Sequence, residues 1–496
     1  MKSKMFKKIM AAALATAMTA SMAGCGNNNA PVSGSDASDT SSTPASSEAS
    51  SSEDTSSEEE VSSEEEEVGQ YTVLTDENGN VYDLGGMEII IRDWWSGDPA
   101  EPTNDYEEAT QEYREWIQET YNFTIKSQAI SDWASAPTDF VEYVTTGGDD
   151  NNYAFIVRDD AAVTGAMAQG LMYDLATLDC LDFSEDMFQQ NLLHEQYAKG
   201  SSIYAMYAGI SEPRTGIYFN KRLLKEAGID PEQIYDWQAS GEWTWDKWTE
   251  LMAQVQRDVD NDGTIDVYGT TQNTGAIVGP AIYSNGGAFI GKDADGNFTY
   301  DLENPETLEA LEWFVGVLTD YNLPYPTDAQ WDYYKEGFMN GEAAFMPEDG
   351  YAGAQNGYLN EMADDYGFVM FPKGPQMNDY VNCWTNNPVV IPACYDEQRA
   401  WNIAFAWKLY NSPIPGYEDY EGWKPGYYAG MRDTRAVDET ATMMTEKGMV
   451  AYVGVVPNVS LGSDFTWNIT AGCVVSEQVE KIRDTWKGYI DEANNM

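Results

Sequence analysis

Histidine is almost absent from this 496-residue chain, which contains only His194. The motifs HExxH and GxSxG and a phosphate-binding P-loop are also absent, as is a cysteine with a matching histidine partner. A catalytic triad built on His194 is therefore a poor hypothesis, and we expect its imidazole on the surface of a helix. A glycosidase that works through two carboxylates needs no such motif, so the 83 acidic residues leave that class open.

Cysteine is scarce as well, with five residues and no pair in CxxC spacing. This spacing excludes the usual zinc and thiol-redox motifs. Cys25 lies near the N-terminus, and the others are Cys180, Cys383, Cys394 and Cys473. One or two disulfides and buried free thiols fit these four residues equally well, so the sequence predicts no pairing.

The chain lacks an apolar run of the roughly 20 residues that a membrane span requires. Its longest apolar run, residues 9–22, follows four lysines and precedes small residues, which is typical of a secretion signal. Residues 22–25, Met-Ala-Gly-Cys, look like a lipobox, so we predict a lipoprotein signal peptide at 1–24 and a lipidated Cys25. The lipid would hold the protein at the extracellular face of the cell membrane. An ordinary signal peptide with an incidental cysteine is the alternative.

Positive charge is also scarce, because 27 Lys and Arg face 83 acids and the formal net charge is −56. The signal carries four lysines without acids, and residues 26–68 carry twelve acids without bases, which leaves a net charge of about −48 on the remaining body. Such a field repels nucleic acid and anionic lipid. We therefore expect no nucleic-acid partner, and membrane contact only through the lipid.

Residues 26–68 are almost entirely Ser, Glu, Asp, Thr, Ala, Asn, Gly and Pro. They cannot bury enough apolar surface to offset the entropy of ordering, so we predict that 25–68 is a lipidated, disordered tether. The rest of the chain is too long for one ordinary hydrophobic core and suggests two lobes or domains.

The first part of the body alternates between strand and helix patterns. Strands are predicted at 87–91, 123–125 and 153–157, with helices at 105–121 and around 139–145. This alternation is typical of a mostly parallel α/β sheet, in which ligands bind beyond the carboxyl ends of the strands.

A stripe of tryptophans lies at helical spacing further along the chain. Thr244 is a predicted N-cap, and Trp245 and Trp248 follow at the spacing of one helix face, with Trp243 just before. We expect these rings in a core and not in a ligand site.

The stretch 215–269 carries a resemblance to a known family. Its residues Tyr218, Asn220, Lys221, Ala227 and Gly228 resemble the YNK…AG crossover of family 1 extracellular solute-binding proteins, the binding lipoproteins of ABC sugar importers. Further segments that resemble the family follow in the family's order, at 166–178, 331–355, 367–375 and 386–410. The resemblance covers most of residues 87–412, while 413–496 match only loosely.

The resemblance implies an α/β, two-lobed periplasmic-binding-protein-like fold of type II, with a ligand cleft between lobes that two or three crossings join. It places lobe 1 at 69–213, lobe 2 at 214–372, a return to lobe 1 at 373–430 and C-terminal helices, mainly of lobe 2, at 431–496. It also implies a monomer without catalysis that captures a carbohydrate by hinge closure and delivers it to an ABC permease. The aromatic content favours an oligosaccharide.

A sugar site needs flat aromatic rings for the C–H faces of the sugar and polar groups for its hydroxyls. The 16 Trp and 32 Tyr supply candidates. The aromatic candidates are Trp95, Tyr351 and Trp384, and the polar candidates are Arg158, Asp159, Glu212 and Asp349. Each also has a structural interpretation, as a core or surface ring, a solvated charge or an interlobe ion pair.

The acidic loop after the tryptophan stripe has the spacing of a calcium loop. Alternating carboxylates and a tight-turn glycine occur in the order Asp258, Asp260, Asp262, Gly263, Thr264 and Asp266. The twelfth position is Gly269 where a calcium loop has a bidentate Glu. We predict a structural Ca²⁺ site here, and an Asx-rich turn is the alternative.

Two other functions remain open at this stage. A protein of the same fold that binds a cationic solute or a peptide would exploit the acidic body, and its binding would be sensitive to salt. A secreted carbohydrate-active enzyme would turn its glycan over.

Overall fold

The structure of the protein is a computed structural model that describes residues 71–99, 101–158, 161–207, 209–385 and 387–495. The chain divides into two units, Met1–Val68 and Gly69–Met496, and the described residues belong to the second. The predicted signal peptide, Cys25 and the tether lie outside the described residues, and so does Asp159. No helix in the described part of the chain is long and apolar enough to cross a membrane.

Lobe 1 is built on a four-stranded sheet in the order β13-β3-β1-β2. Strand β1 (Met87–Asp93) pairs in parallel with β2 (Phe123–Ala129) and β3 (Asn152–Ile156), and β13 (Val389–Val390) pairs antiparallel with β3. The predicted strands are thus confirmed. The main helices of this lobe are α2 (Asp105–Thr120), α3 (Ala136–Thr145), α4 (Ala161–Ala168) and α13 (Glu397–Asn411).

Helix α2 shows how local sequence determines these elements. The Asn104 side chain accepts a hydrogen bond from the Glu107 backbone N–H at 3.0 Å, which caps the helix, and the acids of its first turn favour the positive end of the helix dipole. Tyr113 and Ile117, four residues apart, are buried against the sheet side.

Lobe 2 is built on a second four-stranded sheet in the order β11-β6-β10-β7. Strand β6 (Thr215–Asn220) pairs antiparallel with β10 (Ala343–Asp349) and β11 (Tyr366–Met370), while β7 (Tyr268–Thr270) pairs in parallel with β10. The main helices of this lobe are α7 (Lys221–Glu226), α8 (Glu232–Ser240), α9 (Trp245–Val255), α10 (Thr274–Tyr283), α11 (Pro305–Asp320) and α12 (Tyr333–Met339).

The tryptophan stripe is part of the lobe 2 core, as predicted. Thr244 caps α9, and Trp243, Trp245 and Trp248 are almost fully buried. The Trp245 ring stacks on the Trp313 ring of α11, with centroids 4.1 Å apart and planes 3° from parallel. These contacts leave the rings no free face for a ligand.

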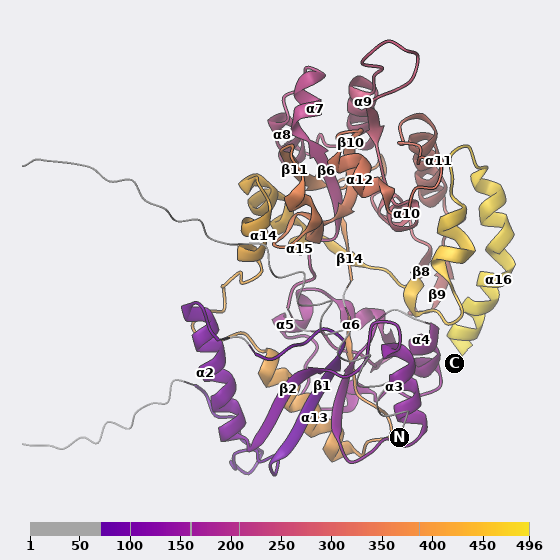
Figure 1. Cartoon of the computed structure of the whole chain (residues 1–496). Helices are drawn as coiled ribbons and strands as arrows, with labels where there is room; N and C mark the ends of the chain where they lie inside the picture. The colour runs from indigo at the N-terminus through magenta and orange to yellow at the C-terminus, as the bar shows by residue number, and fades with distance from the viewer. Residues whose placement is uncertain (1–70, 100, 159–160, 208, 386, 496) are drawn as a thin grey trace, which may run out of the picture. The chain divides into compact units, whose positions relative to one another are not determined.

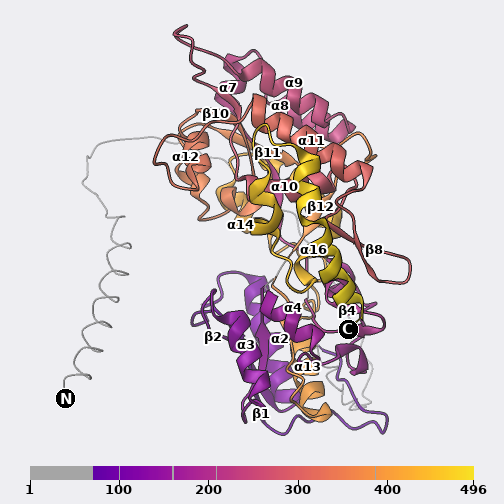
Figure 2. The same cartoon turned by 90° about the vertical axis from the view of Figure 1, so that its right-hand side faces the viewer.

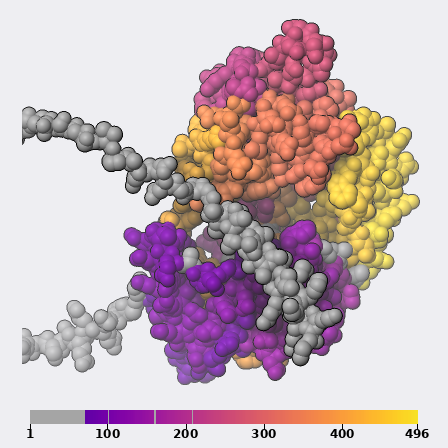
Figure 3. Space-filling view, viewed as in Figure 1, coloured from indigo at the N-terminus to yellow at the C-terminus, as the bar shows by residue number. Residues whose placement is uncertain are grey.

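The chain crosses between the lobes three times: before β6, between β11 and β13, and between α13 and α14 (Lys424–Gly430). The last crossing leads α14 onto η2 (Gly350–Gly353) of lobe 2, although the domain boundaries inferred from the sequence assign 373–430 to lobe 1. Figures 1 and 2 show α13 against the lobe 1 sheet and α14 on lobe 2. In Figure 3 the surface is hollowed between the two lobes.

The C-terminal segment completes lobe 2. Strand β14 (Gly448–Val450) pairs in parallel with β12 (Asn382–Trp384), and α16 (Val475–Asn495) packs on α11 and β9 (Phe298–Tyr300). The segment 461–468 contributes a short π-helix, η6 (Leu461–Phe465), and a 3-10 turn, η7 (Thr466–Asn468), which packs on α10.

The residues Tyr218, Asn220 and Lys221 of the family-like stretch are structural. The buried Tyr218 hydroxyl donates to the Gly350 carbonyl at 2.9 Å and accepts the Gly353 N–H at 3.0 Å. The Asn220 side chain caps α7 and donates to Asp364 at 2.9 Å. Both contacts fix the end of β6 to turns that lie more than 130 residues later in the chain.

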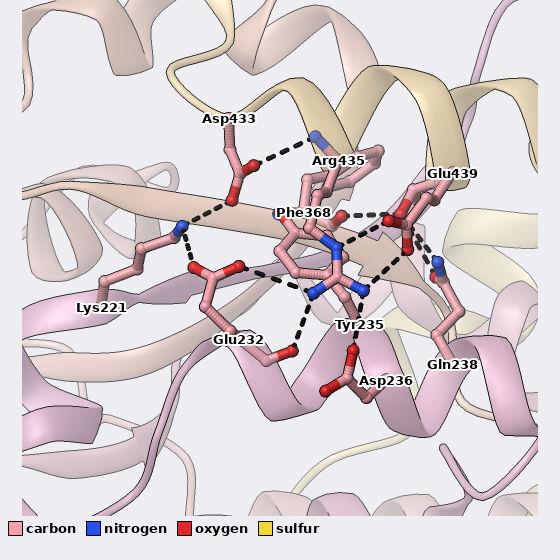
Figure 4. A network of polar contacts seen from close by, with 10 residues as sticks. Lys221, Glu232, Tyr235, Asp236, Gln238, Phe368, Asp433, Arg435 and Glu439 are labelled. Carbon is pink, nitrogen blue, oxygen red and sulfur yellow. Dashed lines mark hydrogen bonds and ion pairs between the residues drawn. The ribbon is translucent and has the colours of Figure 1, made fainter.

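Lys221 begins a network of charges that attaches the C-terminal segment to lobe 2 (Figure 4). Its ammonium contacts Glu232 at 2.8 Å and also Asp433. Arg435 then reaches Asp236 at 2.9 Å and Glu439 at 2.6 Å, and so joins α8 to η4 (Ala436–Ala441). These pairs raise the pKa of Arg435 above its ordinary value, so its charge is permanent.

The structure differs from the sequence-based expectation for the single histidine and settles the pairing of the four cysteines of the body. The prediction of a surface position for His194 is wrong: its side chain is 6% exposed, it lies 5.1 Å from the Phe183 ring, and burial lowers its pKa. The reason is that its helix, α6 (Leu193–Gln196), is a single turn enclosed by Phe183 and Phe188. Cys180, Cys383, Cys394 and Cys473 form no disulfide with one another.

Asp433→Asn should destabilise the protein by about 1–2 kcal/mol, between the values for exposed and buried ion pairs, because Lys221 and Asp433 are only 15% and 11% exposed. Urea denaturation of residues 69–496 measures this loss. Asp332→Asn is the control, since the Lys335–Asp332 pair is more exposed, at 26% and 39%, and 3.6 Å apart. It should change the free energy of unfolding by less than about 0.5 kcal/mol. Equal losses in both variants would contradict a stabilising role for the network.

Candidate ligand-binding cleft

The carboxyl end of β1 presents Trp95. The carboxylate of Asp93, which is 1% exposed, accepts hydrogen bonds from the backbone N–H groups of Trp95 at 3.2 Å and Ser96 at 3.0 Å. The Asp93 carbonyl accepts another from Ile130 at 3.1 Å, in the loop after β2. This buried residue fixes both loops, and the Trp95 ring remains 56% exposed.

Trp95 lines a chamber of about 520 Å³ at the end of lobe 1. Its other walls include Tyr207, Glu212, Arg214, Tyr410 and Asn411, which come from the first crossing and from the end of α13. Aromatic rings, a carboxylate, a guanidinium and an amide thus face one space, and such a mixture suits a ligand with both apolar faces and hydroxyl groups.

A second chamber, of about 250 Å³, lies at the end of lobe 2. Its walls include Gly275 and Tyr283 of α10, Asp349 at the end of β10, and Trp384 and Thr385 on the second crossing. Arg214 lines this chamber as well as the first. The two chambers therefore adjoin at Arg214.

Arg214 is held by groups from three separate segments. Its guanidinium donates to the Thr385 carbonyl at 2.9 Å and lies 3.6 Å from the Asp349 carboxylate and 3.8 Å from that of Glu212. Asp349 also accepts the Thr215 hydroxyl at 2.8 Å. Arg214 is not among the site residues predicted from the sequence, because no local pattern distinguishes it from other loop arginines.

Tyr351 stands on η2, two residues after Asp349; it lines neither chamber, and its ring is 46% exposed. The Tyr218 hydroxyl fixes the backbone of this turn, as described above. Burial, together with the charges of Glu348 and Asp349, raises the pKa of Tyr351 to about 12, so its hydroxyl keeps its proton and can donate a hydrogen bond. Glu348 itself is buried, and Tyr334 and Tyr358 donate to it at 2.7 Å and 3.1 Å.

Trp384 has a different environment from the one we expected. It lines the smaller chamber, but it is only 7% exposed, its Nε1 donates to the Met444 carbonyl at 3.0 Å, and its ring lies over Gly448, where any Cβ would come within 1.8 Å. Because the glycine-facing side is closed, the structure makes Trp384 a supporting wall and not a stacking surface.

Arg158 contacts Trp133 through both a hydrogen bond and a cation–π interaction. Its Nε donates to the Trp133 carbonyl at 2.9 Å, and its guanidinium lies 4.2 Å from the Trp133 ring centroid. Among the described residues that line the two chambers, Arg158 is not included. Trp133 is 61% exposed, and no local sequence pattern distinguishes it from other surface tryptophans.

The acidic loop brings three of its carboxylates together. Oxygens of Asp258, Asp260 and Asp262 lie within 4.8 Å of one another. Asp258 also accepts the Gly263 N–H at 2.8 Å, across the tight turn where Gly263 has a φ of +93°. Asp266 turns its carboxylate to the Val259 N–H at 2.7 Å, and so lies apart from that group. Three hard oxygen donors fit Ca²⁺ in part, and Ca²⁺ binding stays a prediction.

Two α/β lobes, joined by three crossings and lining one cleft, define the periplasmic-binding-protein-like class, and the predicted fold is confirmed. The family described as bacterial extracellular solute-binding protein matches residues 123–411, more than half of the chain. The chain therefore belongs to family 1 of the bacterial extracellular solute-binding proteins, the substrate-binding proteins of ABC transporters. This family is non-enzymatic, which removes the enzyme alternative.

Solved structures agree on the fold. A sugar transporter from Rhizobium etli is 13% identical, with a TM-score of 0.55 over 83% of this chain and 100% of that one. A cyclic alpha-maltosyl-1,6-maltose binding protein from Arthrobacter globiformis is 14% identical, with a TM-score of 0.53 over 83% and 98%. A Mycobacterium tuberculosis protein in complex with glycerophosphocholine is 17% identical, with a TM-score of 0.51 over 77% and 95%. No curated protein sequence matches significantly.

Tyr218→Phe should cost about 1–3 kcal/mol of unfolding free energy, because the Gly353 N–H and the Gly350 carbonyl lose a buried partner. Chemical denaturation measures this cost. The control is Tyr428→Phe, whose hydroxyl bonds Asp438 on the surface, and it should change the free energy by less than about 0.5 kcal/mol. A neutral Tyr218→Phe would mean that the turn bearing Tyr351 is held by other contacts.

The acidic loop should bind one Ca²⁺, and saturation at about 100 times Kd should stabilise the fold by about 2.7 kcal/mol through mass action. Isothermal titration with Ca²⁺ and thermal melts in EDTA measure both quantities. Asp260→Asn should abolish the heat and the shift in Tm. Asp293→Asn is the control, since Asp293 accepts the Asn297 N–H at 2.9 Å in another acidic turn, and it should leave Ca²⁺ binding intact. A wild-type protein without a heat signal would favour the Asx-rich turn.

Proposed function

We propose that this protein captures an oligosaccharide outside the cell and delivers it to an ABC permease. The observation that carries the proposal is the exposed Trp95 ring, which lines the larger chamber together with Arg214 and Glu212. A second exposed ring, Tyr351, follows two residues after Asp349, which lines the smaller chamber. Rings stack on the C–H faces of sugars, while charged and amide groups exchange hydrogen bonds with the hydroxyls.

The structural relatives support a sugar without identifying one. The Rhizobium etli protein is described as a sugar transporter, and the Arthrobacter globiformis protein is described as binding a cyclic maltosyl-maltose. The Mycobacterium tuberculosis protein holds glycerophosphocholine, so the fold alone does not specify the ligand class. The proposal for this chain therefore depends on its own aromatic and polar residues.

Delivery would follow from hinge closure. A ligand that contacts Trp95 and Tyr351 together binds the closed state more tightly than the open state, and this difference in affinity shifts the population towards closure. A permease that recognises the closed state would then accept only loaded protein. A lipid on Cys25 and a tether at 25–68 would keep the protein beside its permease at the extracellular face.

A cationic solute or a peptide is the second candidate, and the net charge of about −48 on the body favours it. Two carboxylates, Glu212 and Asp349, also reach the cleft. Arg214 lies between them, however, and its positive charge opposes a cationic ligand at the point where the chambers meet. The cleft is therefore better suited to a neutral ligand.

The test is to titrate residues 69–496 with panels of oligosaccharides, polyamines and peptides while tryptophan fluorescence is followed. We expect saturable binding of one glycan that salt does not weaken, with the glycan recovered uncleaved. Trp95→Ala and Tyr351→Ala should each weaken binding about tenfold or more, as expected for aromatic anchors.

The matched controls are Trp331→Ala and Tyr428→Ala, which remove exposed rings that do not line either chamber. They should leave the affinity unchanged within about twofold. If no glycan changes the tryptophan fluorescence and a polyamine or peptide gives a salt-sensitive change, the second candidate replaces this proposal.

A further inference from the structure

One tryptophan of the C-terminal segment is exposed although its neighbours are buried. Trp467 is 67% exposed, whereas Phe465, Thr466 and Ile469 have no exposed surface. This segment lies after residue 411, where the match to the family ends. The ring is therefore outside the part of the chain that the family model matches.

The backbone that carries Trp467 is rigidly held. The Asp464 carboxylate accepts the Trp486 Nε1–H of α16 at 3.1 Å and the Ser460 N–H at 3.2 Å. The Asn468 side chain donates to the Ser463 carbonyl at 3.2 Å, which closes the turn on the other side of Trp467. The π-helix η6 precedes this turn, and such helices are frequent at functional sites. The ring is thus presented by a frame that does not need a ligand to order it.

Two glycines determine where the ring lies. A Cβ on Gly275 would come within 2.8 Å of Trp467 Nε1, and a Cβ on Gly462 would come within 2.9 Å of Cε2 and Cζ2. Any side chain at either position would displace the indole, because real Cβ contacts are longer than this. The absence of these two Cβ atoms lets the Nε1 side of the ring lie against α10 while most of its surface faces solvent.

Gly275 also lines the smaller chamber, together with Ala276 and Gly279 of α10 and Leu461 of η6. Trp467 does not line this chamber itself, but its Nε1 edge touches Gly275, which does, so the ring adjoins the chamber at this glycine. Arg214 and Asp349 provide charged hydrogen-bonding groups to the same chamber. An exposed ring therefore stands beside a chamber of about 250 Å³ with polar walls, while the neighbouring chamber of Trp95 measures about 520 Å³.

We propose that Trp467 and the smaller chamber form a subsite for a single terminal pyranose ring of the captured glycan, whose remaining rings occupy the larger chamber. The inference rests on the proposed carbohydrate function and extends it. The volume of the smaller chamber lies just below the range of roughly 300–1,000 Å³ typical of small-molecule pockets, which suits one ring and not a chain. Trp467 stacks on the C–H face of this ring. Arg214 donates hydrogen bonds to its hydroxyl oxygens, and Asp349 accepts hydrogen bonds from its hydroxyl groups.

The experiment uses the chain from residue 26 onward and a ladder of glycans of increasing length, taken from the series that binds the wild-type protein. Trp467→Ala should weaken binding of the glycan with the highest affinity by about tenfold, whereas Trp467→Phe should retain most of the affinity, because stacking needs a ring and not an indole. Shorter glycans that fill only the larger chamber should bind both variants equally well.

Gly275→Ala should weaken binding of the same glycan although it removes no aromatic ring, because the new Cβ displaces Trp467. Gly316→Ala is the matched control, a helical glycine with no atom within 4 Å of an added Cβ, and it should leave the affinity unchanged. Trp331→Ala is the control for loss of an exposed ring. Melting curves confirm that each variant is folded.

The outcomes separate this inference from the proposed function. If the wild-type protein binds a glycan and Trp467→Ala binds every length of it as tightly as the wild type, the subsite is refuted and the carbohydrate function stands. An equal loss in Trp331→Ala and Trp467→Ala would refute it as well. If the wild-type protein binds no glycan, the carbohydrate function fails first.

Discussion

The cleft depends on the contacts of one guanidinium. Arg214 stands on the first crossing, donates to the Thr385 carbonyl on the second crossing and lies beside the Asp349 carboxylate at the end of β10. A planar group with five donors can reach partners in several directions at once, which the point charge of a lysine cannot do in the same way. Because Arg214 lines both chambers, its position determines how lobe 1 and lobe 2 present their groups to a common ligand.

Buried polar contacts hold the exposed rings in place. The carboxylate of Asp93 folds back the turn that carries Trp95, the hydroxyl of Tyr218 closes the turn that carries Tyr351, and the carboxylate of Asp464 anchors the turn that carries Trp467. The entropy of ordering each ring is therefore lost on folding and not on binding. The family-like residues Tyr218, Asn220 and Lys221 accordingly serve the frame, while the candidate binding residues occupy the turns that the frame supports.

The C-terminal segment is an integral part of lobe 2. Its β14 pairs with β12, its α16 packs on α11, and the charges around Arg435 attach it to α8 (Figure 4). The family model matches residues 123–411, so this segment follows the matched region. Substitutions in this segment can therefore alter the wall of the smaller chamber while the sheet, the crossings and Arg214 remain unchanged.

The sequence by itself determined the features that local chemistry encodes. Helix caps such as Thr244, the alternation of strands and helices, the buried tryptophan stripe and the YNK crossover all led to the right fold, and strand ends led to Trp95. The tertiary structure alone decided which side chains reach the cleft. It buried Trp384 on Gly448, 64 positions later in the chain, and enclosed His194 between phenylalanines. It also brought Arg214 into both chambers and Trp467 against Gly275, which lines the smaller one. Burial and proximity depend on contacts between distant segments, and residues on turns carry no local pattern that predicts such contacts.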